Sequence, residues 1–144
     1  MIDLSPFQNA VQQLSSAREE QAREPHRRLL QAGLIQTFEY TYELAHKMLR
    51  RYLASIDASP ASIEALSFED LIRRGDDAGL LHSPVATWRT FREARSITSH
   101  TYNEAKADKV AALIPAFDEE ARYLLQQLLK HSGHFTARLD TGGE

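Results

Sequence analysis

The sequence predicts an all-α fold, an antiparallel four-helix up-and-down bundle with an additional short helix. Apolar residues recur at steps of three and four through four long segments, proline and polar capping residues separate these segments, and no segment alternates apolar and polar residues as a strand does. At 144 residues, 42% of them hydrophobic, the chain is long enough for one domain with a core and too short for two ordinary ones. We expect one helical domain over residues 1–130 and a flexible tail over residues 131–144, which holds three glycines.

The first two helices are predicted on either side of a proline. Ser5-Pro6 is typical of an N-cap followed by proline at the first helical position, and it opens a helix over residues 5–22. Pro25 ends that helix. The longest pattern follows over residues 26–55, where a helix of roughly 28 residues would reach ~42 Å. Its apolar positions step by three or four residues: Leu30, Leu34, Phe38, Tyr42, Ala45, Leu49 and Leu53.

The second half of the chain contains a short helix and two longer ones. The segment 57–60 reads as a break, and Ser67 with Asp70 three residues on is a variant of the capping box that opens a short helix ending near Gly79. Ser83-Pro84 repeats the capped-proline signal and opens a helix that reaches about Ser99.

A last helix is predicted after Tyr102-Asn103 and should end near Lys130, with Pro115 as a kink near its first turns.

Composition excludes several classes of chemistry and of partner. Without cysteine, the chain can form no disulfide, thiolate zinc site or cysteine nucleophile. The net charge of -3 argues against broad electrostatic binding of nucleic acid, although a local basic site stays possible. No apolar run approaches the roughly 18 residues of a membrane span, and the first residues lack the pattern of a signal peptide. We therefore expect a cytoplasmic protein without cofactor, metal, membrane or DNA partner.

The segment RSITSHTY places Arg95, His100 and Tyr102 within eight residues at the predicted end of a helix. In a continuous helix a five-residue step leaves Arg95 and His100 roughly 140° apart, so they converge only if the helix ends. The β-branched Thr98 and Thr101 indicate an end near Ser99 or His100.

A second possible alignment joins Arg92, Ser96 and His100 at steps of four.

Arginine and histidine suffice for cleavage of RNA without a metal. A neutral histidine can take the proton of a 2′-hydroxyl while an arginine stabilises charge that develops on the phosphate. One chain offers one such histidine at this corner, so a complete site with a base and an acid requires a two-fold dimer. The alternative is a structural pair, in which Arg95 binds a carboxylate of the second helix and His100 lies at the negative end of a helix dipole.

The string RSITSHTYNE resembles the signature of HEPN domains, in the extended form with a tyrosine that marks HepT-like toxins. The string GLIQTFEYTYELAHKMLRRYL, over residues 33–53, resembles the long second helix of nucleotidyltransferase substrate-binding subunits. With Trp88 and Phe91 the resemblance covers most of residues 5–130. It implies a dimeric helical bundle, the toxin of a type II/VII-like toxin–antitoxin pair, that acts as a metal-independent endoribonuclease on RNA such as transfer RNA, with a cognate minimal nucleotidyltransferase as antitoxin.

The resemblance also implies roles for individual residues. Arg95 and His100 would be the catalytic pair, and the antitoxin would transfer adenylyl groups to Tyr102. Each added group brings a negative phosphodiester to the place where an RNA phosphate would bind, which would silence the site. The residue after the motif arginine is commonly Asn, Asp or His in the family, whereas this chain has Ser96. That departure favours the runner-up reading, a non-catalytic substrate-binding or regulatory subunit with Arg95 as phosphate anchor.

Other polar residues support lesser hypotheses. Glu39 and Glu43 stand four apart and share a helix face with His46, where they could orient Arg95 or bind a cation. His131 and His134 have the spacing of metal ligands but lie in the expected tail. The basic pairs are interpreted mainly as surface charge, and the aromatic residues mainly as core: Arg27-Arg28, Arg50-Arg51 and Arg73-Arg74, and Tyr40, Tyr42, Trp88 and Phe91.

Overall fold

The computed structural model describes residues 2–132, and over these residues the chain is helical and contains no strand. The elements are α1 (Ser5–Arg23), α2 (Arg28–Ile56), α3 (Pro60–Glu64), α4 (Phe68–Asp77), α5 (Val85–Ser96), the 3₁₀ turn η1 (Thr98–His100) and α6 (Glu104–His131). The predicted all-α fold is confirmed. Most of the expected tail lies outside the described residues.

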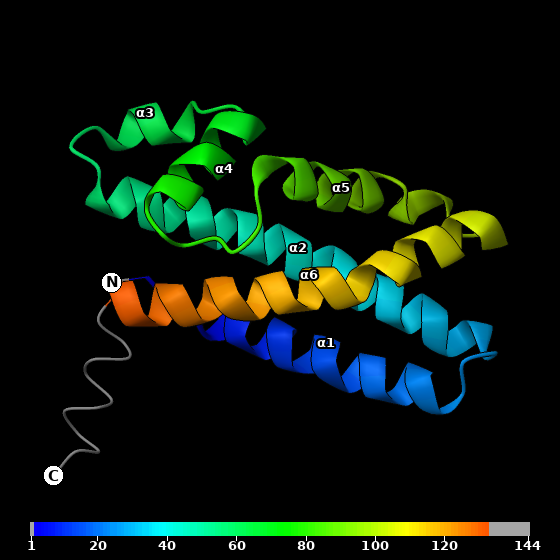
Figure 1. Cartoon of the computed structure of the whole chain (residues 1–144). Helices are drawn as coiled ribbons and strands as arrows, with labels where there is room; N and C mark the ends of the chain where they lie inside the picture. Colours follow the sequence, from blue (N-terminus) through cyan, green and yellow to red (C-terminus); the bar gives the residue numbers. More distant parts are fainter. Residues whose placement is uncertain (1, 133–144) are drawn as a thin grey trace, which may run out of the picture.

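The four long helices run alternately up and down (Figure 1). In that view α1 and α5 run in one direction, while α2 and α6 run in the other, and α2 packs against all three of its long neighbours. The short helices α3 and α4 lie over the C-terminal half of α2, and η1 lies at the opposite end of the bundle with the start of α6. The bundle therefore has a distinct end at which α5 meets η1 and α6.

The core centres on a cluster of aromatic rings from α2, α5 and α6. Phe117 makes edge-to-face contacts with Phe38 at 5.0 Å and with Phe91 at 5.3 Å, and Phe91 meets Trp88 in the same way at 5.4 Å. These four side chains are fully buried, and Tyr42 beside them is 5% exposed. The interpretation of Tyr42, Trp88 and Phe91 as core residues is confirmed. Each such pair contributes about 1 kcal/mol beyond the burial of its area.

Tyr40 is exposed, unlike Tyr42, Trp88 and Phe91. Its side chain is 37% exposed, and its hydroxyl donates a hydrogen bond to Gln13 of α1. Tyr40 thus lies on the surface between α1 and α2 and is not part of the core.

Two predicted N-caps were wrong by one residue, although the first helix begins at residue 5 as predicted. The N-cap of α1 is Leu4, so Ser5 is already helical and its backbone N–H donates to Asp3 Oδ1 at 3.0 Å. The N-cap of α5 is Pro84 and not Ser83. Proline fits either position, because the first amides of a helix have no intrahelical acceptor and a missing N–H costs nothing there. The Ser-Pro pair therefore marks the start of a helix without fixing its first residue.

Helix α3 was not predicted, because five residues are too few to show a helical period. Ile63 of α3 is fully buried, and Arg50 of α2 donates to the carbonyl oxygens of Ile63, Glu64 and Leu66 at 2.7, 3.3 and 3.3 Å. Arg50 thus satisfies carbonyls that the end of a helix leaves unpaired.

The neighbouring prediction for α4 is confirmed, since Ser67 Oγ accepts from the Asp70 N–H at 3.3 Å. The last helix is continuous through Pro115 and ends at His131, one residue beyond the predicted end. None of the described helices combines the length and the apolar character that a membrane span would need.

Two buried carboxylates of α6 connect it to the rest of the bundle, and neither was predicted from the sequence. Glu120 Oε2 accepts from the backbone N–H of His82 at 2.9 Å and from Trp88 Nε1 at 3.3 Å. The fully buried Asp118 accepts from Arg18 of α1 at 2.6 Å and from Arg122 at 3.1 and 2.6 Å. Burial works to raise the pKa of Asp118, but the hydrogen bonds from Arg122 and Arg18 outweigh burial and hold the pKa below its ordinary value.

Asp118→Asn should lower the free energy of unfolding by about 2 kcal/mol, because hydrogen bonds to a charged group are lost. A lowered folded-state pKa contributes stability that is present above about pH 4 and is lost as the pH falls through the folded pKa. The wild type should therefore lose stability in acid more steeply than the variant, as measured by urea unfolding from pH 7 down to pH 2. Glu119→Gln, at the exposed neighbouring position, is the control. Equal acid sensitivity of wild type and Asp118→Asn would contradict this account.

Candidate functional site

Helix α5 ends at Ser96, three residues before the predicted end near Ser99. The hydroxyl of Ser96 donates to the Glu93 carbonyl at 2.7 Å, and the hydroxyl of Thr98 donates to the Arg95 carbonyl at 2.8 Å. Such hydroxyls compete with backbone amides for the last carbonyls of a helix. The helix therefore ends before His100, which is the condition under which His100 could approach Arg95. Its end lies earlier than the position near Ser99 that Thr98 and Thr101 had indicated.

Arg95 is held against α2 by two carboxylates. One of its terminal nitrogens, Nη1, lies 3.1 Å from Glu39 Oε2, and its Nε lies 3.7 Å from Glu43 Oε2. The Thr98 hydroxyl joins this network, because it accepts from Arg95 at 3.3 Å and lies 3.2 Å from Glu39 Oε2. Glu39 and Glu43 thus lie where the sequence analysis placed them as residues that orient Arg95. The Arg95 side chain stays 31% exposed, although its Nε is buried.

His100 and Tyr102 lie beyond the end of α5, and both are exposed. Their ring centroids are 6.4 Å apart with an interplanar angle of 72°, and the Tyr102 side chain is 86% exposed. Within residues 2–132 of one copy, no hydrogen bond joins His100 to Arg95. The alignment of His100 with Arg92 and Ser96 is wrong, since the α-helix that would align them ends at Ser96.

Arg92 and Ser96 instead share a hollow with Arg95, which we call the arginine groove. Its volume is about 460 Å³, and it lies between α2, α4 and α5. The lining residues are Tyr42, Glu43, His46, Arg50, Phe68, Arg92, Arg95 and Ser96. The Arg92 guanidinium lies 4.7 Å from the centre of the Phe68 ring, and the His46 ring is parallel to that ring within 7°. Cationic and aromatic groups therefore meet in one open hollow.

At pH 7 the side chains that line the arginine groove carry a net positive charge. Burial, assisted by the charge of Arg50, lowers the pKa of His46, so its imidazole is neutral at pH 7. Burial raises the pKa of Tyr42 to about 12, so its phenol also stays neutral. Three arginines remain, with Glu43 as the one carboxylate among the lining residues.

Tyr102 borders a different hollow of about 270 Å³ between α2 and the start of α6. Arg28 lies in the same hollow, bound to Asp108 at 2.7 Å and to Glu104 at 3.4 Å. The sequence analysis named Arg28 as part of a basic pair but could not place it beside Tyr102, because the two residues are 74 positions apart.

The remaining candidates are structural or lie outside the described residues. Among the other basic residues, Arg27, Arg73 and Arg74 form surface ion pairs, as interpreted from the sequence. His131 is the last residue of α6, and His134 lies outside the described residues. Over residues 2–132, no cluster of three or more acidic or histidine side chains is placed to hold a metal ion.

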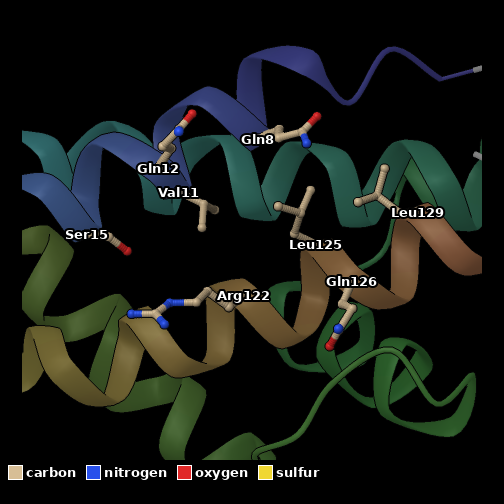
Figure 2. A pocket seen from close by; sticks show the side chains of 8 residues that line it. All are labelled: Gln8, Val11, Gln12, Ser15, Arg122, Leu125, Gln126 and Leu129. Atoms are coloured by element: carbon tan, nitrogen blue, oxygen red, sulfur yellow. The ribbon is translucent and has the colours of Figure 1, made fainter. Parts of the chain in front are cut away.

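A further hollow, larger than the arginine groove, lies between α1 and α6 and has a volume of about 520 Å³. Figure 2 shows Val11 of α1 and Leu125 of α6 facing one another across it. Its charged lining residue, Arg122, is bound to Asp118. None of the candidate site residues borders this hollow, so the corner at the end of α5 is the better functional candidate.

The fold and this corner together define an all-helical bundle with an arginine, a histidine and a tyrosine at the end of α5. A family model described as "Nucleotidyltransferase substrate binding protein like" matches residues 2–130, and the chain belongs to this family. The resemblance proposed from the sequence is therefore confirmed.

Two similar proteins come from Haemophilus influenzae. The chain is 41% identical over 97 residues to "Probable ribonuclease HepT", and the alignment covers 67% of this chain and 66% of that protein, slightly less than two thirds. The structure of HI0074, described as the fold of a substrate binding domain of a nucleotidyltransferase, superposes with a TM-score of 0.82 at 33% identity. That superposition covers 88% of this chain and 98% of HI0074.

The His46 imidazole should titrate below its ordinary value, because burial and Arg50 disfavour its charged form. Glu43→Gln should lower the pKa of His46 further, since Glu43 acts to raise it. A proton-detected NMR titration of the histidine ring resonances from pH 4 to pH 9 measures both effects, with Glu19→Gln on α1 as the control. A titration of His46 at or above the ordinary value would contradict the described electrostatics of the groove.

Proposed function

We propose that this protein is the toxin of a toxin–antitoxin pair, a metal-independent endoribonuclease whose site is formed at a homodimer interface and silenced by adenylylation of Tyr102. The observation that carries the proposal is the corner at the end of α5. There Arg95 is fixed by Glu39, and His100 is presented to solvent five residues on. The similarity to a probable ribonuclease adds support from an independent source.

The proposed chemistry assigns one task to each group. A neutral His100 takes the proton of an RNA 2′-hydroxyl, and the 2′-oxygen then attacks the adjacent phosphorus. Arg95 stabilises the negative charge that develops on the phosphate oxygens. The bond to the 5′-oxygen breaks, and that oxygen takes a proton from a protonated histidine. Glu39 and Thr98 are positioning residues, since they contact Arg95 and not the reacting atoms.

The proposed reaction requires a dimer, because it uses two histidines as base and acid. One copy supplies one exposed histidine there, since His46 beside Arg95 is half-buried and stacked on Phe68, whereas the reaction uses a base and an acid. In addition, no hydrogen bond joins His100 to Arg95 within residues 2–132 of one copy, so we infer a second copy related by a two-fold axis as the source of the missing partner. Two copies would bring two imidazoles and two guanidinium groups to one cleft.

Regulation at Tyr102 fits its exposure. A nucleotidyltransferase can reach a phenol that is 86% exposed. The phenol oxygen would attack the α-phosphorus of ATP, pyrophosphate would leave, and the phenol proton would pass to a base of the transferase. The product carries a negative phosphodiester close to His100, whose ring centroid is 6.4 Å from that of Tyr102.

The alternative function is a non-catalytic substrate-binding or regulatory subunit of a nucleotidyltransferase. It is favoured by Ser96 after the motif arginine and by the two carboxylates that neutralise Arg95. The description of the similar Haemophilus influenzae structure as a substrate binding domain also agrees with it. In this role Arg95 would anchor a phosphate without cleaving RNA.

Arg95→Ala and His100→Ala should each reduce cleavage of a transfer-RNA pool by at least 100-fold in the presence of EDTA, the lower end of the range for general acid–base catalysis. His26→Ala, at an exposed position before α2, is the matched control and should cleave like the wild type. All variants should first be shown to be folded dimers. Intact RNA with every protein, the wild type included, would overturn the nuclease and favour the binding subunit.

Tyr102→Phe should not be adenylylated by the cognate nucleotidyltransferase with ATP, while Tyr40→Phe should gain the same mass as the wild type. Both tyrosines are surface residues, but only Tyr102 borders the candidate site. Intact-protein mass spectrometry measures the modification, and cleavage by the modified wild type should fall. Modification of Tyr102→Phe to the wild-type extent would place the acceptor elsewhere.

A further inference from the structure

We propose that the arginine groove binds the phosphate backbone of single-stranded RNA and leads it to Arg95, with Arg92 as the phosphate-contacting residue. This inference rests on the proposed function for the identity of the substrate. The groove lies on α2, α4 and α5, and it holds Arg95 but neither His100 nor Tyr102.

The first reason is that Arg95 alone is a poor anion receptor. Its guanidinium lies 3.1 Å from Glu39 and 3.7 Å from Glu43, so two negative charges oppose its one positive charge. A phosphate that approaches Arg95 is therefore repelled by both carboxylates. The attraction that brings RNA to this corner must come from other cations nearby.

Arg92 is the cation that is free to supply it. Its side chain is exposed, and within residues 2–132 no carboxylate lies at ion-pair distance from it. The nearby carboxylate of Glu69 instead accepts two hydrogen bonds from Arg89, at 2.7 and 2.9 Å. The Arg92 guanidinium is instead placed over the Phe68 ring at 4.7 Å, a contact that orients it without cancelling its charge.

Arg50, which lines the groove from α2, adds to the positive field. Its hydrogen bonds go to the carbonyl oxygens of Ile63, Glu64 and Leu66, which carry no net charge. His46, one turn before Arg50 on α2, is neutral at pH 7 because burial and Arg50 lower its pKa. Uncompensated positive charge is thus concentrated here, on a chain whose net charge is -3.

Shape and position agree with a bound strand. A volume of about 460 Å³ is within the range of ligand-binding pockets, about 300–1,000 Å³. The half-buried rings of His46 and Phe68 offer apolar surface to nucleobases, as in proteins that bind single strands by stacking and charge. On α5, Arg92 lies about one turn before Arg95, so a backbone held at Arg92 continues to the proposed cleavage residue.

The test is equilibrium binding of a fluorescent single-stranded RNA that carries 2′-O-methyl groups throughout and so cannot be cleaved through its 2′-hydroxyls. Arg92→Gln should weaken binding about tenfold, the loss of one charge-assisted contact. It should also reduce the slope of log affinity against log salt by about 0.7, the value for one phosphate contact on a single strand. Arg92→Lys, which keeps the charge, should regain most of the affinity.

The matched control is Arg23→Gln, which removes the same charge from the exposed end of α1, where Arg23 pairs with Glu20. It should bind RNA like the wild type. Thermal unfolding of each variant checks that the loss of the Phe68 contact has not unfolded the protein, and Arg92→Lys gives a second reading if Arg92→Gln is destabilised.

Two results would overturn the proposal: equal weakening by Arg92→Gln and Arg23→Gln, or wild-type RNA binding by Arg92→Gln together with loss of ATP binding. The second result would assign the groove to a free nucleotide. Because binding is measured with uncleavable RNA, the two proposals can fail separately. A protein that cleaves no RNA but binds it more weakly as Arg92→Gln would contradict the nuclease function and support RNA binding in the groove. Normal cleavage, with unchanged binding by Arg92→Gln, would support the nuclease function and contradict RNA binding in the groove.

Discussion

The contact between Arg95 and the carboxylates of α2 is the interaction on which the candidate site depends. It fixes the last turn of α5 against the long helix α2, and Thr98 extends the same network into η1. Because α5 ends at Ser96, the chain turns through η1 and leaves His100 and Tyr102 at the surface. Had the helix continued, Arg95 and His100 would face roughly 140° apart on one cylinder. The geometry of the corner is therefore a consequence of where one helix stops and of what its last arginine binds.

The distribution of charge explains how an acidic chain can present a site for an anion. Most arginines of the described surface are used in ion pairs, with partners such as Glu24, Glu69 and Asp57. The arginine groove departs from this pattern, because Arg50 is bound by carbonyl oxygens and Arg92 by an aromatic ring. Both contacts orient a guanidinium and leave its charge in place. Net charge, which sums over the whole surface, could not reveal this local concentration.

The sequence predicted the four long helices well, since most of the periodic apolar residues of α1, α2, α5 and α6 are buried in the core, with Phe38 and Trp88 among them. It also offered Glu39 and Glu43, which a four-residue step places on one helix face, as residues that could orient Arg95 or bind a cation, and the structure shows both beside Arg95. The predicted first residue of α5 was wrong by one, because proline fits more than one position at the start of a helix. Its predicted end was wrong by three, because the hydroxyls of Ser96 and Thr98 bind the last carbonyls. The arginine groove and the place of Arg28 beside Tyr102 depend on contacts between distant segments, which no spacing along the chain encodes.

The central claim is that His100 and Arg95 cleave RNA by activating its own 2′-hydroxyl. The most direct test is the chemistry of the product ends, determined by enzymatic end-labelling and mass spectrometry of a defined RNA incubated with the purified protein and EDTA. The account predicts a 2′,3′-cyclic phosphate on one fragment and a 5′-hydroxyl on the other, because the attacking oxygen belongs to the substrate. Fragments that carry a 5′-phosphate and a 3′-hydroxyl would show attack by water and would contradict the account.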